Sequence, residues 1–201
     1  MKFARLGAAP LPAIILLISA CSDPPAPPAQ AAVTLSISPA PGKTCTTTNG
    51  QLAMPSKFNA SVIQELNCDL SKGCKPDDYV VVDHDPGTSV SCTVAPANGN
   101  FSVLLSLDVD GSSTGAPSMH FSMSGNLMPN GGTASVNESN SVAGGGGSQQ
   151  DCTVSIMSPM GVIAKGKVWG AFQCNAFRDE RNIGDTGCQV QGQFLFENCD
   201  S

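Results

Sequence analysis

Charged and aromatic residues are scarce in this sequence of 201 residues, at 13% and 5% respectively. Two histidines, one tryptophan and one tyrosine are present, and sixteen acidic residues outnumber ten Lys and Arg residues, for a net charge of −6. DNA and RNA are poor partners, because a nucleic-acid binder needs a basic patch. Low charge combined with 21 glycines and 15 prolines favours short extended segments joined by turns over surface helices.

The motifs of several enzyme classes are missing as well. No Gly-x-Ser-x-Gly sequence supplies a hydrolase nucleophile, and a Ser-His-Asp hydrolase would have to use His84 or His120. No glycine-rich phosphate loop is present. Structural zinc usually needs two close cysteine pairs, whereas Cys68 and Cys74 are separated by five residues. We therefore expect no cofactor and favour a non-catalytic protein over an enzyme.

The first twenty residues have the pattern of a secretory signal. Lys2 and Arg5 precede an apolar run from Leu6 to Ala20 that contains no acidic residue. The run is shorter than the roughly 20 apolar residues that a membrane-spanning helix needs, and two prolines interrupt its start. We therefore expect residues 1–20 to be a signal peptide rather than a transmembrane anchor.

The end of this segment, Ile18-Ser19-Ala20-Cys21, resembles the lipobox of bacterial lipoproteins. The resemblance implies cleavage before Cys21, a diacylglyceryl thioether on its sulfur, and a further acyl chain such as palmitate on the new amine. Ser22 in the next position resembles the residue that directs such lipoproteins to the outer membrane of Gram-negative bacteria. Several chains are needed for firm anchoring, because each buried methylene contributes only about 0.8 kcal/mol. The alternative is an ordinary cleavage site that leaves Cys21 as a further disulfide cysteine.

The mature chain divides into a short tether and one domain. Residues 21–32 include the proline-rich stretch from Asp23 to Gln30, whose composition predicts an extended polyproline spacer. Residues 33–201 are expected to form a single domain. The glycine-rich stretch at 143–149 is interpreted as a flexible loop within it, since a domain boundary there would leave a piece of about fifty residues, too small to fold alone.

Apolar residues alternate with polar ones along much of this domain, which predicts β-strands. Turn-forming sequences such as Asn98-Gly99-Asn100 and Asn130-Gly131-Gly132 separate them. The best helical candidate, Lys57 to Leu66, fits a strand as well. Recurrent strands and turns predict an antiparallel β-sandwich of the jelly-roll or immunoglobulin-like type, held by disulfides. The predicted strands are 33–37, 60–66, 79–82, 90–94, 101–109, 121–127, 152–156, 168–174 and 188–196.

Eight cysteines remain once Cys21 is assigned to lipid, and an even number in an exported protein predicts four disulfides. The connectivity stays open, because eight cysteines allow about 105 pairings. Predicted strands that end at Cys174 and begin at Cys188 would place these two opposite each other at the mouth of a hairpin. Cys68 and Cys74 are suited to closing a local loop. The other pairs, chiefly by elimination, are Cys92 with Cys152 and Cys45 with Cys199.

Acidic residues offer two candidate sites. Asp108 and Asp110 alternate as the oxygen ligands of a calcium loop do, but Ser106 and Pro117 occupy the first and last ligand positions of the EF-hand pattern. The two aspartates are therefore weak calcium candidates. The cluster from Asp77 to Asp85, which includes His84, is expected to be mostly a solvated loop.

Two other residue types suggest chemistry and have a simpler interpretation. Trp169 is expected on the face opposite Val168 and Phe172, where a lone Trp more often covers the second side of a sheet than forms a sugar-binding platform. The methionines recur at apolar strand positions, which indicates core packing rather than copper capture.

The C-terminal pattern Gly166-x-Val168-x-Gly170-x-Phe172-x-Cys174, then Cys188-x-Val190-x-Gly192-x-Phe194-x-Phe196-x-x-Cys199, is similar to uncharacterised cysteine-rich secreted lipoproteins of Gram-negative bacteria. The resemblance implies an all-β domain and carries no activity. We therefore expect a non-catalytic binding or structural module, lipid-anchored in the cell envelope at the outer membrane, with a protein or glycan partner. The alternative is an envelope hydrolase or calcium-dependent carbohydrate-binding module centred on the Asp77 to Asp85 loop or on Asp108 and Asp110.

Overall fold

Antiparallel β-strands make up all of the regular structure in the residues that the computed structural model describes, which are 24–43, 51–52, 81–110, 118–140, 145–156, 161–179 and 187–201. The predicted all-β, antiparallel fold is confirmed. The strands are β1 (Gln30–Pro39), β2 (Gln51–Leu52), β3 (Val81–Val82), β4 (Thr88–Ala97), β5 (Asn100–Val109), β6 (Met119–Leu127), β7 (Gly131–Asn140), β8 (Gly145–Ser155), β9 (Val162–Ala164), β10 (Lys167–Asp179) and β11 (Cys188–Glu197).

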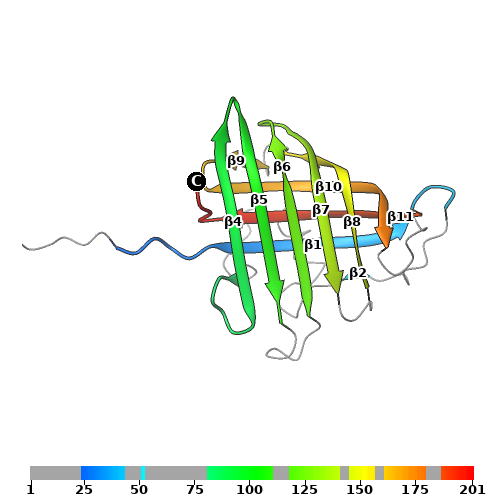
Figure 1. Cartoon of the computed structure of the whole chain (residues 1–201), viewed down its shortest axis with the longest axis horizontal. Coiled ribbons are helices and arrows are strands. Elements are labelled where there is room, and N and C mark those ends of the chain that lie inside the picture. Colours follow the sequence, from blue (N-terminus) through cyan, green and yellow to red (C-terminus); the bar gives the residue numbers. More distant parts are fainter. Residues whose placement is uncertain are drawn as a thin grey trace, which may run out of the picture.

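These strands belong to one sheet that folds into two layers. The order along the sheet is β2-β1-β11-β10-β8-β7-β6-β5-β4, with β3 added to β1 and β9 to β10. Figure 1 shows β4 to β8 upright, with β10, β11 and β1 lying across them. Crossed strands are one of the two common arrangements of packed sheet faces. The sheet is thereby nearly closed into a barrel.

The strand order in the upright layer is a meander. From β4 to β8 each strand pairs with the next one along the chain. This connectivity differs from the Greek-key crossovers of jelly rolls and immunoglobulin domains. The two-residue turn between β4 and β5 uses Asn98 and Gly99, both with positive φ, as hairpin turns of this length require.

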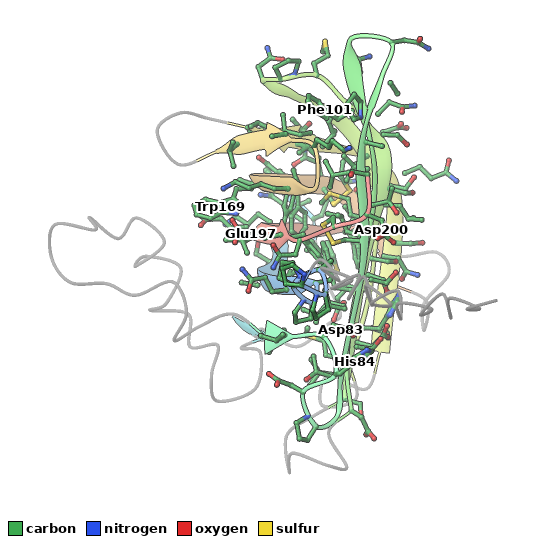
Figure 2. All side chains as sticks on the ribbon, turned by 90° about the vertical axis from the view of Figure 1, so that its left-hand side faces the viewer. Asp83, His84, Phe101, Trp169, Glu197 and Asp200 are labelled. Atoms are coloured by element: carbon green, nitrogen blue, oxygen red, sulfur yellow. A yellow bond between two sulfur atoms is a disulfide. The ribbon has the colours of Figure 1, made fainter. Side chains whose placement is uncertain are left out.

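Main-chain groups from the end of the chain close the sheet at the free edge of β4. The Val94 N–H donates to the Asp200 carbonyl at 2.8 Å, and the Asp200 N–H donates to the Cys92 carbonyl at 2.9 Å. The Gly166 N–H, between β9 and β10, donates to the Val94 carbonyl at 2.9 Å. Figure 2 shows Asp200 beside the upright strands. Because an open edge is a template for pairing with other chains, these contacts protect β4 as well as closing the fold.

The interior between the layers is filled by the apolar sides of the alternating strands. Ring contacts join the layers, since Phe121 on β6 lies 5.6 Å from Phe172 and 6.5 Å from Phe196, measured between ring centroids. Met119 and Met123 are buried there, as predicted for core methionines, whereas Met128 is exposed. The predicted inward rows are confirmed, and their buried members are Val90, Cys92, Val94, Val103, Leu105, Leu107, Val109, Phe121, Met123, Leu127, Cys152, Val154, Ile156, Val168, Phe172, Cys174, Cys188, Val190, Phe194 and Phe196.

A glycine in the predicted inward row of β10 has a packing reason. A Cβ atom on Gly170 would lie 2.7 Å from the Ile156 side chain and 2.9 Å from the Ser155 carbonyl oxygen. It would also lie 3.1 Å from the ring of Phe194 on β11. Gly170 therefore makes room for the aromatic ring opposite it, which explains a glycine within an otherwise apolar row.

Two disulfides join parts of the sheet, and they differ from the predicted pairs. Cys152 on β8 bonds to Cys174 on β10, and Cys92 on β4 bonds to Cys199 after β11. The predicted pairs Cys174–Cys188, Cys92–Cys152 and Cys45–Cys199 are therefore wrong. Cys188 is disulfide-bonded as well. The predicted pair Cys68–Cys74 and the lipidation site Cys21 also lie outside them.

The register of β10 explains why Cys174 does not form the predicted disulfide with Cys188. This residue lies opposite Val190, and an irregularity between Cys174 and Phe177 then places Phe177, not Cys174, opposite Cys188. On its other side β10 pairs with β8, where Gln173 lies opposite Thr153. Cys152 is consequently the directly adjacent cysteine, with a Cα–Cα distance of 4.4 Å.

Some strand boundaries also differ from the predictions. The stretch predicted as a glycine-rich loop at 143–149 is strand from Gly145 onward, because β7 on one side and β10 on the other supply hydrogen-bonding partners. β7 and β9 were not predicted. β1 begins at Gln30, inside the predicted tether 21–32, where the small Ala31 and Ala32 are buried. The predicted strand 60–66 lies outside the described residues, as does Tyr79.

We predict that the Cys92–Cys199 disulfide stabilises the fold more than Cys152–Cys174 does. The sequence separations are 107 and 22 residues. The loop-closure model gives about 4.7 kcal/mol for a loop of about 100 residues and about 3 kcal/mol for one of about 15. Urea unfolding of the Cys92→Ala/Cys199→Ala and Cys152→Ala/Cys174→Ala variants measures the two losses. A larger loss for the second variant contradicts the role of Cys92–Cys199 in closing the sheet.

Candidate functional site

The outward side of β4, β5, β6 and β7 is an array of small polar side chains, which we call the serine face. Its members alternate with the buried core residues of the same strands and line up in rows across the sheet. The rows are Ser89, Asp108, His120 and Ser139, then Ser91, Ser106, Ser122 and Asn137, then Thr93, Leu104, Ser124 and Ser135.

The chemistry of the serine face is polar but almost uncharged. No Lys or Arg occurs in β4 to β8, and Asp108 and His120 are the titratable residues of the face. Leu104 interrupts the polar array and is 60% exposed. The face therefore offers hydroxyl and amide groups for hydrogen bonds, with one apolar side chain among them.

Asp108, His120 and Ser122 form a hydrogen-bonded series on this face. The Asp108 Oδ1 atom lies 2.6 Å from the His120 Nδ1 atom, and the His120 Nε2 atom lies 3.3 Å from the Ser122 Oγ atom. The imidazole is 34% exposed and the carboxylate 53% exposed. The Ser106 hydroxyl donates to the other Asp108 oxygen at 3.3 Å. The order carboxylate, imidazole, hydroxyl is that of a Ser-His-Asp relay.

Strand geometry brings these three side chains together. Asp108 on β5 lies directly opposite His120 on β6, and Ser122 is two residues further along β6, so all three point to the same side of the sheet. The sequence indicates His120 as one of two histidines available to a hydrolase. Ser122 and Ser106 were missed, because their proximity to His120 depends on a strand register that the sequence alone does not fix.

The calcium candidates Asp108 and Asp110 take part in different contacts. Asp108 pairs with His120, while the main-chain N–H of Asp110 donates to the Gly87 carbonyl at 2.7 Å. Within the described ranges, no group of three or more His, Cys, Asp or Glu side chains is placed to hold a metal ion.

The described part of the acidic cluster organises the turn between β3 and β4. The Asp83 carboxylate accepts a hydrogen bond from the Val90 N–H at 2.9 Å, and the Asp85 carboxylate accepts one from the Val82 N–H at 3.4 Å. His84 has a positive φ of 72° and an 88% exposed side chain. Figure 2 shows Asp83 and His84 at one end of the upright strands. Asp77 and Asp78 lie outside the described residues.

The other layer carries a charged group of side chains next to Trp169. As predicted, Trp169 faces away from Val168 and Phe172. The Lys167 amino group lies 5.1 Å from the centre of the Trp169 ring and 3.2 Å from a Glu197 oxygen. The second Glu197 oxygen accepts a hydrogen bond from Gln30 at 2.7 Å. The Lys167, Glu197 and Gln30 contacts join β1, β10 and β11, whereas the buried Trp169 Nε1–H has no hydrogen-bond partner among the described residues.

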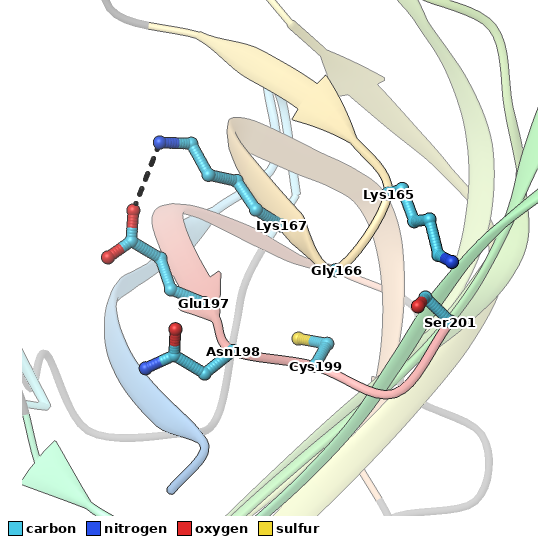
Figure 3. A pocket seen from close by; sticks show the side chains of 7 residues that line it. All are labelled: Lys165, Gly166, Lys167, Glu197, Asn198, Cys199 and Ser201. Carbon is cyan, nitrogen blue, oxygen red and sulfur yellow. Dashed lines mark ion pairs between the residues drawn. The ribbon is translucent and has the colours of Figure 1, made fainter. Parts of the chain in front are cut away.

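A shallow hollow of about 510 Å³ lies beside this group. Figure 3 shows Lys167 paired with Glu197 on one side of it and Lys165 pointing towards Ser201 on the other. Gly166, Asn198 and Cys199 also line it, and the Gly166 and Cys199 N–H groups are already used in main-chain hydrogen bonds. Two main-chain donors that line the hollow are therefore unavailable to a ligand.

Comparison with family models, with curated proteins and with solved structures finds no match to this chain. In the part of the chain that the structure describes, no helix is long and apolar enough to cross a membrane.

We predict that neutral His120 carries its proton on Nδ1. The 2.6 Å contact requires a proton between Nδ1 and the Asp108 carboxylate, which leaves Nε2 as the acceptor for the Ser122 hydroxyl. Nitrogen-15 chemical shifts of the neutral imidazole report the tautomer. In the Asp108→Asn variant, His120 should lose its preference for the proton on Nδ1. A proton on Nε2 in the unmodified protein contradicts the proposed order of the series.

Proposed function

We propose that this chain is a lipid-anchored binding module of the cell envelope, and that the serine face binds a neutral, hydroxyl-rich glycan. The observation that carries the proposal is the serine face itself, a broad exposed sheet surface of hydroxyl and amide side chains without Lys or Arg. Four strands about 4.8 Å apart give a surface roughly 15 to 20 Å wide, which is enough for an extended chain lying across it.

The polarity of the face supports a glycan over an anionic polymer. Phosphate and carboxylate groups are usually bound by Arg and Lys, which β4 to β8 lack. Serine hydroxyls and Asn137 both donate and accept hydrogen bonds, so they match the hydroxyl groups of a sugar. Leu104 adds an exposed apolar contact for the C–H side of a sugar ring.

The interior supports binding on the outside of the sheet. The space between the layers is occupied by the buried aliphatic, aromatic and cysteine side chains of both layers. A ligand of any size would have to displace this packing, at a cost of several kcal/mol for each large side chain moved.

The beginning of the domain fits the proposed anchor. Pro24 to Pro28 are exposed and β1 begins at Gln30. Eight residues lie between Cys21 and Gln30, and at about 3.1 Å per residue in a polyproline conformation they would span about 25 Å. Such a spacer would hold the serine face away from the lipid surface, where a glycan can reach it.

We expect the Cys21→Ser variant to leave the membrane fraction. Serine lacks the thiol that would carry the diacylglyceryl group, and the remaining chain has no other proposed anchor. Fractionation of cells that express either form, with washing in the absence of detergent, measures the distribution. If the variant stays with membranes as firmly as the unmodified protein, the lipid anchor is contradicted.

We expect the domain to bind neutral glycans on an array and to lose about tenfold in affinity in a Ser91→Ala/Ser124→Ala variant. Each lost hydrogen bond contributes about 0.5–1.5 kcal/mol, and 1.4 kcal/mol corresponds to tenfold. Gln191→Ala, at an exposed position of β11 in the other layer, is the matched control and should bind normally. Absence of neutral glycan binding, or equal loss in the control, contradicts the proposal.

A further inference from the structure

We propose that Ser122 is an activated nucleophile, with His120 as its general base and Asp108 as the positioning residue, and that it reacts with carboxylic esters. This inference goes beyond binding and does not depend on the identity of the glycan. It rests on the two contacts that place the imidazole between the carboxylate and the hydroxyl, 2.6 Å to Asp108 and 3.3 Å to Ser122.

In the relay, the carboxylate, the imidazole and the hydroxyl can each take the role that the reaction requires. The Asp108 carboxylate accepts the Nδ1 proton of His120, so Nε2 has a free lone pair directed at the Ser122 hydroxyl. A serine hydroxyl is a weak nucleophile by itself and needs such an adjacent base. Asp108 is held in turn by the Ser106 hydroxyl at 3.3 Å, which fixes the second carboxylate oxygen.

The reaction is an acyl transfer in two steps. The Ser122 oxygen forms a bond to the acyl carbon as its proton moves to His120 Nε2. The ester C–O bond then breaks, and the departing alcohol takes that proton from His120. In the second step His120 takes a proton from water as the water oxygen attacks the acyl carbon, and the acid leaves while the proton returns to Ser122.

The surroundings of Ser122 indicate the type of ester. The site is open on the serine face, so a polar molecule can reach it without a channel. Leu104, 60% exposed, lies diagonally across from Ser122 on β5, at a separation of about 7–8 Å that an acyl chain can bridge. Short acyl esters carried on a polar molecule therefore fit better than long lipid esters, which need a deep apolar pocket.

The pairing of β6 within the sheet also limits the expected rate of ester hydrolysis. β6 pairs with β5 on one side and β7 on the other, so its main-chain N–H groups are used in the sheet and do not form an oxyanion hole. The Ser106 hydroxyl lies opposite Ser122 but donates its one proton to Asp108, so it does not supply an oxyanion donor either. Since oxyanion donors commonly contribute factors of about 10² to 10³, we expect acylation of Ser122 with slow turnover.

A fluorophosphonate probe followed by peptide mass spectrometry tests the proposal on the full chain. We expect labelling of Ser122, with a rate about a hundredfold lower in His120→Gln, the range in which general bases contribute. Ser122→Ala should abolish labelling at this peptide. Ser38→Ala is the matched control, because Ser38 lies on β1 in the other layer, outside the serine face, and its loss should leave the rate unchanged. Thermal unfolding establishes that each variant is folded.

Asp108→Asn is the test of the positioning residue. It should slow labelling and, in the same sample, abolish the preference of His120 for a proton on Nδ1 in the nitrogen-15 spectrum. The rate of p-nitrophenyl acetate hydrolysis should fall in the same variants that slow labelling. An acyl-serine intermediate should form at Ser122. No labelling of Ser122, or equal labelling in His120→Gln, overturns the proposal. Absence of neutral glycan binding in the unmodified protein, together with His120-dependent labelling of Ser122, would contradict the glycan proposal and support this one, because the two activities are measured independently.

Discussion

The contact between β4 and the last residues of the chain is the constraint on which the rest of the structure depends. Without it the folded sheet would have an open edge at β4, and the two layers would be joined chiefly through the strands that turn from one layer into the other. The Cys92–Cys199 disulfide and the paired main-chain bonds at Val94 and Asp200 fix that edge. A closed sheet keeps its small core sealed and holds the outer side chains of β4 to β7 in register, which explains how so few aromatic rings suffice.

The sequence is sufficient to predict which side chains share one face of a strand. In a strand the side chains alternate with a period of two, so Phe101, Val103, Leu105, Leu107 and Val109 must share one side whichever strand lies next to them. The same alternation places Trp169 and Phe172 on opposite faces of their strand. It fails for β7, whose inward side carries the small Ala134 and the acidic Glu138, because this pattern is too weakly apolar to be recognised.

Pairing between strands could not be predicted, and both the disulfides and the candidate site depend on it. The register of β10 and β11 places Val190, not Cys188, opposite Cys174, and the pairing of β10 with β8 leaves Cys152 as its partner. Asp108 and His120 are twelve residues apart in the chain and meet only because β5 and β6 pair in one particular register. A shift of the β5–β6 pairing by one residue would point the His120 side chain into the core. The relay is therefore a property of the register, and the polar composition of the serine face is a property of the sequence.

Hydrogen exchange at the closure of the sheet tests this account most directly. The amide protons of Val94 and Asp200 are donors in the bonds that join β4 to the end of the chain. We predict that both exchange nearly as slowly as amides in the middle of β5 and β6, since opening them requires opening the closed sheet. In a folded Cys92→Ala/Cys199→Ala variant their protection should fall selectively. Exchange of both amides at the rate of an unstructured chain end, in the intact protein, would show that the sheet is not closed there.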